Sequence, residues 1–386
     1  MGIIIWGAKR DNYKKINYKY YCLFLTWFLL PFLIGFFYSK FFSSVLQFSV
    51  LIFSFPFLFL VLFGHIKPQK TKTNLVIVSL ILSVNVLTLV LERKHYDLFY
   101  HNVLKEILLD YDEVNQSSNN TLFIVDSFEN ITNYYSDKLK IDIDFVAYNS
   151  FDNISDFKLF IEENKNYKNL FFGCLSAIDP LCIPIIEEYY PKIEWRRDYV
   201  GGSTYLFSKR GFGDNNKLIA HLDFESKESD LWSSIDSLKI TGSISLSGVN
   251  SYMIDSETEW GPSFCEDLNN IILNENDFID VSVKVKSIDS LDGVVLVTTL
   301  SVGDDNVYWG GVDFSNFTLL NKIENEWVTI HSSVKLSDID ISYRDIKVKV
   351  YIWNKGKRNL FIDDFEVNLR LGNPIIYGLN EKISRQ

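Results

Sequence analysis

The chain has 386 residues and a formal net charge of −11, with 47% hydrophobic and 23% charged residues. This charge argues against nucleic acid as a partner, because a nucleic-acid site needs an excess of Lys and Arg. Only four cysteines and five histidines occur, and the absence of C-x-x-C and H-E-x-x-H patterns excludes the common zinc motifs.

Long apolar segments near the N-terminus predict membrane spans. A bilayer core of roughly 30 Å is crossed by about 20 mostly apolar helical residues. Three segments suit this, at about residues 20–37, 45–64 and 74–91. The second is apolar on every side, whereas a soluble helix shows a polar face; a fully buried core helix is the alternative. Residues 1–92 are therefore predicted to be a transmembrane region.

Basic residues set the expected orientation of these spans. Five precede the first span and three lie between the second and third: Lys9, Arg10, Lys14, Lys15, Lys19, Lys67, Lys70 and Lys72. The positive-inside rule places such segments in the cytoplasm. We therefore expect a multi-pass protein of the inner (plasma) membrane, embedded in the lipid bilayer, with a cytoplasmic N-terminus. The remaining domains would be periplasmic or extracellular.

Short β-rich runs alternate with amphipathic runs between residues 119 and 209. Strands alternating with helices predict a small α/β domain with a mainly parallel sheet, which we place at 93–210. No glycine-rich phosphate-binding motif occurs, so nucleotide binding has no sequence support. Cys174 and Cys182 could pair in an oxidising compartment or be ordinary buried thiols, and the sequence leaves both open.

From residue 211 onward, regularly spaced short strands are separated by turns rich in Ser, Asp, Asn and Gly. This pattern predicts an all-β sandwich at 211–376, followed by a tail at 377–386. The length suffices for a core of its own, so we expect this domain to fold independently. The predicted fold class is multi-domain: a helical transmembrane segment, a small α/β domain and a C-terminal β-sandwich.

The apolar segment FLTWFLLPFLIGFFYSKFFSSVLQFSVLIFSFPFLFLVLF, with Pro56-Phe57-Leu58 inside it, resembles a late transmembrane region of certain membrane glycosyltransferases. These form the protein O-mannosyltransferase and aminoarabinose-transferase superfamily, and the resemblance implies a polyprenyl-linked sugar as donor. Their catalytic carboxylates lie in the first outer loop. The loop after the first predicted span here, YSKFFSS, has no carboxylate to act as base or metal ligand. We therefore predict no catalytic residue on this chain.

Four segments of the sandwich resemble carbohydrate-binding-module jelly rolls: LDFES (222–226), SLSGVNS (245–251), EWGPSF (259–264) and KVYIWNKGKRNLFIDDFEV (349–367). In such modules a structural calcium ties the first strand to the last. The resemblance implies Glu225 and Asp363 as its ligands, with Asp223 adding its backbone carbonyl. The two-residue period of a strand places Asp363 among apolar neighbours, where a carboxylate needs a partner. A hydrated carboxylate at the sheet margin is the alternative.

Calcium is accordingly expected to raise the stability of the sandwich. Asp363→Ala is expected to abolish that effect and to leave the metal-free fold little changed.

Sugar binding needs exposed aromatic side chains, because pyranose rings stack on flat surfaces. Trp260 and Trp309 lie beside glycine-rich turns and are the candidate carbohydrate-binding residues. Trp327 and Trp353 lie in alternating strands and are expected in the core.

Two function classes remain open. One is the C-terminal membrane and extracytoplasmic region of a lipid-linked-sugar glycosyltransferase, acting with a separate multi-span catalytic subunit while the sandwich binds glycan or acceptor. The other is a non-catalytic membrane-anchored adhesion or scaffold protein that binds carbohydrate or protein.

Overall fold

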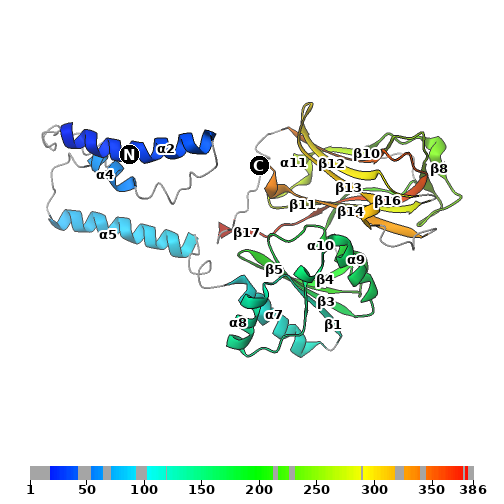
Figure 1. Ribbon diagram of the computed structural model, residues 1–386, viewed down its shortest axis with the longest axis horizontal. Coiled ribbons are helices and arrows are strands. Elements are labelled where there is room, and N and C mark those ends of the chain that lie inside the picture. Colours follow the sequence, from blue (N-terminus) through cyan, green and yellow to red (C-terminus); the bar gives the residue numbers. More distant parts are fainter. Residues whose placement is uncertain are drawn as a thin grey trace. The chain divides into compact units, whose positions relative to one another are not determined.

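The computed structural model describes residues 18–41, 54–63, 71–92, 102–118, 120–211, 216–225, 231–287, 290–317, 326–339, 345–376 and 379–380. The chain divides into two compact units, Met1–Leu87 and Thr88–Gln386. Figure 1 draws both, coloured from blue at the N-terminus to red at the C-terminus.

The first unit is helical, with α2 (Tyr18–Phe41), α4 (Phe55–Phe63) and α5 (Thr71–Leu87). The segment Tyr18–Phe37 is long and apolar enough to cross a membrane, and none of it is buried within the protein. The apolar segment Leu75–Leu91 is shorter than a full span. Residues 45–53 and 64 of the second predicted span lie outside the described residues. Among the described residues, one helix is therefore suited to be an anchor or a signal, and the three-span topology stays a prediction.

The second unit begins with a five-stranded sheet in the order β2-β1-β3-β5-β4. Its strands are β1 (Thr121–Val125), β2 (Val146–Ala147), β3 (Asn169–Leu175), β4 (Lys192–Tyr199) and β5 (Gly202–Ser208). The first three are parallel to one another, as the alternation of strands and helices predicted. The last two form an antiparallel hairpin at the edge next to β3.

Helices cover both faces of this sheet: α7 (Val103–Ser117), α8 (Glu129–Leu139), α9 (Ile154–Glu163) and α10 (Cys182–Tyr189). Along β3, Leu170 and Phe172 pack in the same core cluster as residues of α9 and α10. Phe171 packs with α7 in a separate cluster. Because successive side chains of a strand point to opposite faces, these two clusters lie on opposite sides of the sheet. Figure 1 draws α7 and α9 on either side of its strands.

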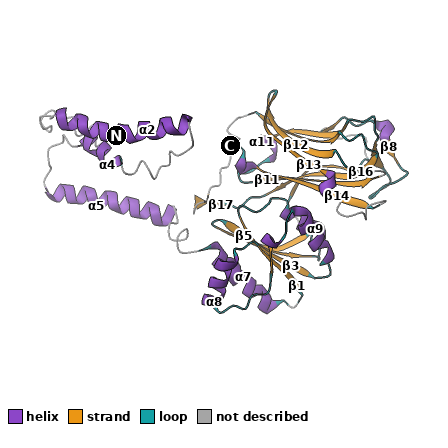
Figure 2. Ribbon diagram, viewed as in Figure 1, coloured by secondary structure: helices purple, strands orange, loops and turns teal. Residues whose placement is uncertain are grey.

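Two antiparallel sheets form a β-sandwich, drawn in orange in Figure 2. One has the order β13-β12-β15-β10-β7 and the other β14-β11-β16-β9-β8, with β6 added beside β16. The strands are β6 (Lys217–Leu222), β7 (Trp232–Ser233), β8 (Ile240–Thr241), β9 (Ser251–Ile254), β10 (Trp260–Asp267), β11 (Phe278–Ser287), β12 (Val294–Val302), β13 (Asp305–Asp313), β14 (Trp327–Lys335), β15 (Ile346–Asn354) and β16 (Leu360–Arg370).

Buried polar contacts join the α/β part to the sandwich. Lys158 of α9 donates to the carbonyl of Thr329 on β14 at 2.8 Å and pairs with Glu188 of α10 at 3.1 Å. The same carboxylate lies 2.9 Å from Nε2 of His331 on β14. One cluster of buried apolar residues also includes members from both parts. The two parts therefore share a core, and independent folding of the sandwich stays a prediction.

This buried cluster predicts a loss of stability on acidification. Burial lowers the pKa of His331 from its usual 6.5 by more than the hydrogen bond to Glu188 raises it. Below about pH 6.5 the unfolded chain therefore takes up a proton that the folded chain resists. One such proton costs about 1.4 kcal/mol of unfolding free energy per pH unit. Urea unfolding between pH 7.5 and 5 checks this.

Glu188 adds to the loss at lower pH. Burial alone would raise its pKa, but the hydrogen bond with His331 and the charge of Lys158 hold that pKa well below its usual range. Its stabilising contribution is therefore present above about pH 4.5 and is lost as the pH falls further. The variant His331→Gln keeps a donor without a titrating ring. If its pH slope above pH 5 equals that of the wild type, His331 is not the group that titrates.

Candidate aromatic binding face

The outer face of the sheet β13-β12-β15-β10-β7 carries aromatic side chains. Along β15 the buried residues are Ile346, Val348, Val350, Ile352 and Asn354. The alternate residues of β15, which include Tyr351 and Trp353, therefore point away from the core. Trp353 pairs in register with Trp260 of β10. Trp309 of β13 pairs with Thr299 of β12, which in turn pairs with Lys349 of β15. The register thus puts both predicted tryptophans on this face.

The rings form two exposed groups. Trp260 is 50% exposed and Trp309 is 52% exposed. Trp260 stacks on Trp353, with ring centroids 5.6 Å apart and an interplanar angle of 8°. Tyr351 meets Trp260 edge-on at 5.6 Å. Trp260, Trp353 and Tyr351 thus make one aromatic surface, and we call it with Trp309 the aromatic face.

Glycine shapes the other end of the aromatic face. A Cβ atom on Gly311 would stand 2.5 Å from the Trp309 ring, so this ring lies across a position that only glycine leaves open. Gly311 pairs in register with Val297, which is fully buried although it shares the outer face with Tyr351. The sheet here is therefore covered by flat rings rather than by projecting side chains.

The expectation that Trp353 is a core residue is wrong. It is half-buried, but it points outward and stacks on Trp260. A signal for this was present in the sequence, because Trp353 shares the strand parity of Lys347 and Lys349, two residues that are rarely buried.

The three acids predicted to bind calcium meet backbone N–H groups. Asp363 is fully buried, and its carboxylate accepts from the N–H groups of Leu246 at 2.8 Å, Ser247 at 3.1 Å and Asp364 at 2.9 Å. The bonds from Leu246 and Ser247 fasten the loop 242–250 to β16, and all three bonds give the buried carboxylate polar partners.

Glu225 holds the same loop, by accepting from the N–H groups of Val249 and Asn250 at 2.6 Å each. Asp223 accepts from the N–H of Glu225 at 3.0 Å and so closes a local turn. Among the described residues, no group of three or more His, Cys, Asp or Glu side chains could hold a metal ion. A calcium site built on these acids stays a prediction.

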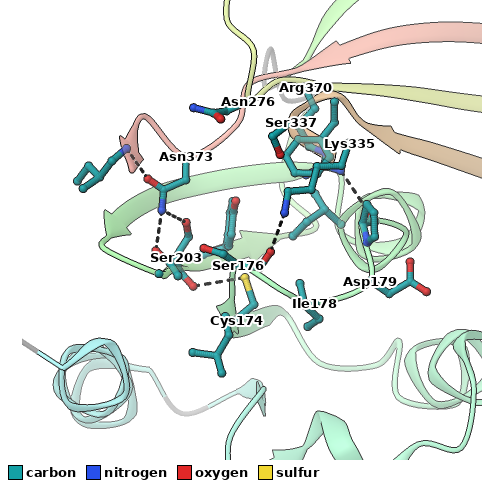
Figure 3. Close-up of a pocket in the computed structure, with 18 of the residues that line it drawn as sticks. Cys174, Ser176, Ile178, Asp179, Ser203, Asn276, Lys335, Ser337, Arg370 and Asn373 are labelled. Carbon is teal, nitrogen blue, oxygen red and sulfur yellow. Dashed lines mark hydrogen bonds between the residues drawn. The ribbon is translucent and has the colours of Figure 1, made fainter. Parts of the chain in front are cut away.

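A cavity of about 520 Å³ opens where β3 and β5 meet the sandwich (Figure 3). Lys335 of β14 donates to the carbonyl of Ser176 across it, at 3.1 Å. Cys174 lines the cavity, but burial raises the pKa of its thiol to about 12, so the thiol stays protonated and is a poor nucleophile. Cys174 and Cys182 are both free thiols. This cavity therefore gives no activated cysteine for catalysis.

No protein-family model and no curated protein matches the chain. Solved structures do. The CBM22-1 xylan-binding domain of Paenibacillus barcinonensis Xyn10C matches at 14% identity and a TM-score of 0.27, over 41% of this chain and 97% of that one. The C-terminal family 22 carbohydrate-binding module of Clostridium thermocellum Xyn10B matches at 15% identity and a TM-score of 0.26, over 44% and 96%. The chain is similar to these carbohydrate-binding modules, whereas membership of the transferase superfamily gains no support.

Proposed function

We propose that this protein binds glycan through the aromatic face. The observation that carries the proposal is that Trp260 and Trp309, each half-exposed, lie on the same face of one sheet. Hydration of the apolar ring surface of an exposed tryptophan is unfavourable, so covering that surface with another apolar surface lowers the free energy. The apolar face of a pyranose ring is such a partner, and its hydroxyl groups remain at the rim to meet water or polar side chains.

Removing either exposed tryptophan should abolish most of this binding. Tryptophans at the centre of an interface contribute about 2 kcal/mol or more when truncated, so Trp260→Ala or Trp309→Ala should weaken binding roughly thirtyfold. Calorimetry with the full chain in neutral detergent, against plant and bacterial cell-wall oligosaccharides, measures the effect. Tyr134→Ala is the matched control, since Tyr134 is 56% exposed on α8, away from this face.

Unchanged affinity in both tryptophan variants would contradict the proposal. Exposed tryptophans also anchor protein partners. If no oligosaccharide binds and a protein partner is lost in the same variants, the aromatic face serves the adhesion or scaffold role with protein as its ligand.

The membrane topology is part of the proposal. Tyr18–Phe37 supplies one span, and the lysine distribution supports a cytoplasmic N-terminus with three spans in all. The aromatic face would then lie outside the cytoplasm, where cell-surface glycans are found. A reporter enzyme that works only outside the cytoplasm should be active when it is fused after Gln386. Activity of a fused reporter that works only in the cytoplasm would contradict this topology.

The finer proposal is that the chain serves a transferase that uses polyprenyl-linked sugars, with the sandwich holding glycan or acceptor beside a separate catalytic subunit. Its support is the resemblance of the apolar region and the outer-loop carboxylates missing from YSKFFSS. An adjacent reading frame with many spans and paired outer-loop acids would favour this transferase role over a non-catalytic adhesion protein.

A further inference from the structure

Two lysines stand against the rings of the aromatic face. The Nζ atom of Lys349 lies 5.4 Å from the ring centroid of Tyr351. The Nζ atom of Lys355 lies 5.5 Å from the ring centroid of Trp353. Each ammonium therefore lies over a ring of the aromatic face, so a sugar can stack only on the ring surfaces that the two lysines leave open.

Neither ammonium is neutralised within the described part of the chain, where no ion pair involves Lys349 or Lys355. The register neighbours of Lys349 are the uncharged residues Cys265 and Thr299.

The acids on this side of the sheet are engaged elsewhere. An oxygen of Asp267 accepts from the N–H of Asn269 at 2.8 Å, and an oxygen of Asp313 accepts from the N–H of Ser315 at 2.9 Å. Both carboxylates therefore cap turns at the ends of their strands. Asp267 also lies opposite Lys347 in register, so Lys347 has a carboxylate across the strand pair and differs in this from Lys349.

We propose that the glycan bound by the aromatic face is built of uronic acids. This inference rests on the proposed glycan-binding function. A uronic acid presents an apolar ring face for stacking and a carboxylate at its edge. The half-exposed rings of Trp260 and Trp309 supply a partner for the first, and the ammonium groups of Lys349 and Lys355 supply a partner for the second. A neutral sugar would leave both ammonium groups without a counter-charge. The chain as a whole carries a charge of −11, so the attraction for a polyanion must come from these local lysines.

The test compares one glycan with and without its charge. Hexagalacturonate and its fully methyl-esterified form share a backbone, and only the first carries carboxylates. Binding of each to the full chain in neutral detergent is measured at low and at high salt. Exposed ion pairs are individually weak, so we expect roughly a threefold to tenfold preference for the acid form at low salt. The preference should shrink as salt rises.

Charge-removing variants locate the effect. In the double variant Lys349→Gln and Lys355→Gln, both forms should bind with the affinity of the ester. The matched control is Lys165→Gln with Lys168→Gln, two exposed lysines of the α/β part, which should keep the preference.

Each other outcome decides a different point. Equal affinity of the acid and the ester would overturn the uronic-acid inference and leave glycan binding by the aromatic face in place. A preference that survives the Lys349 and Lys355 changes would overturn it as well. If neither form binds, and neutral xylo- and manno-oligosaccharides do not bind either, the proposed function fails and this inference fails with it.

Discussion

Replacing Arg370 with methionine should lower the free energy of unfolding by about 3–5 kcal/mol, the usual loss when one partner of a buried ion pair is removed. Nε of Arg370 lies 2.6 Å from a carboxylate oxygen of Asp280 on the neighbouring strand β11. Both side chains are only 7% exposed. The variant would leave the Asp280 carboxylate buried without its counter-charge.

Arg370 also connects the two parts of the second unit. One of its terminal nitrogens donates to the carbonyl of Pro180, just before α10, at 3.1 Å. The guanidinium lies over the ring of Phe278, 4.0 Å from its centroid. The methionine chain can keep the contact with the ring, but not the hydrogen bond. The variant should therefore weaken the contact between the α/β part and the sandwich as well as the sandwich itself.

Urea unfolding of the full chain in neutral detergent, followed by near-ultraviolet circular dichroism, measures the loss. Arg210→Met is the control, because Arg210 is exposed. Replacing both partners, by Arg370→Met with Asp280→Leu, should recover part of the stability, since no charge is then left buried. A change below about 1 kcal/mol in Arg370→Met would show that water reaches Asp280 and that the pair is not truly buried.

Local sequence patterns predicted the elements well and their contacts poorly. The aliphatic alternation Ile346, Val348, Val350 and Ile352 has the two-residue period of a strand with one buried face. The parallel arrangement of β1, β2 and β3 followed from strands alternating with helices. Such signals lie within a few residues of one another, so a single sequence contains them.

Contacts between distant segments left no comparable signal. His331 meets Glu188 from 143 positions away, and Lys158 meets Thr329 from 171 positions away, so no local period links them. The sequence predicted the exposed tryptophans of the aromatic face but not the stacking between its rings, for a related reason. Glycines beside Trp260 and Trp309 marked them as exposed, but the stacking of Trp260 on Trp353 depends on the register of β10 with β15.

Asp363 shows the same division. The sequence predicted a buried carboxylate, and Asp363 is fully buried. It does not share the core face of Phe365 and Val367, however, because the register shifts between Asp363 and Glu366 and leaves Asp363 opposite Lys284. The sequence could not show that the loop 242–250 brings N–H groups to it. Those hydrogen bonds change the expectation for Asp363→Ala in the absence of metal, because the variant now leaves the N–H groups of Leu246, Ser247 and Asp364 without their acceptor.

Asp363→Ala should therefore lower the free energy of unfolding by about 3 kcal/mol even in the presence of a chelator. Hydrogen bonds to a charged group contribute about 1.5–3 kcal/mol each, and their losses are not additive here because the loop can relax. Burial raises the pKa of Asp363 by more than the backbone N–H groups lower it, so ionising this group in the folded state is costly. Asp363→Asn keeps one acceptor oxygen and removes that cost, so it should lose less than half as much.

Calcium can be separated from the hydrogen bonds by measuring each protein with calcium and with chelator. A calcium ion bound only by the folded wild type would add about 2.7 kcal/mol at a hundredfold excess over its dissociation constant. That increment should vanish in Asp363→Ala, whereas the loss in chelator should remain. Equal wild-type stability with calcium and with chelator would show that calcium does not stabilise the folded protein. An Asp363→Ala variant as stable as the wild type in chelator would instead contradict the anchoring of the loop, and a metal would be the better explanation for a buried carboxylate at this position.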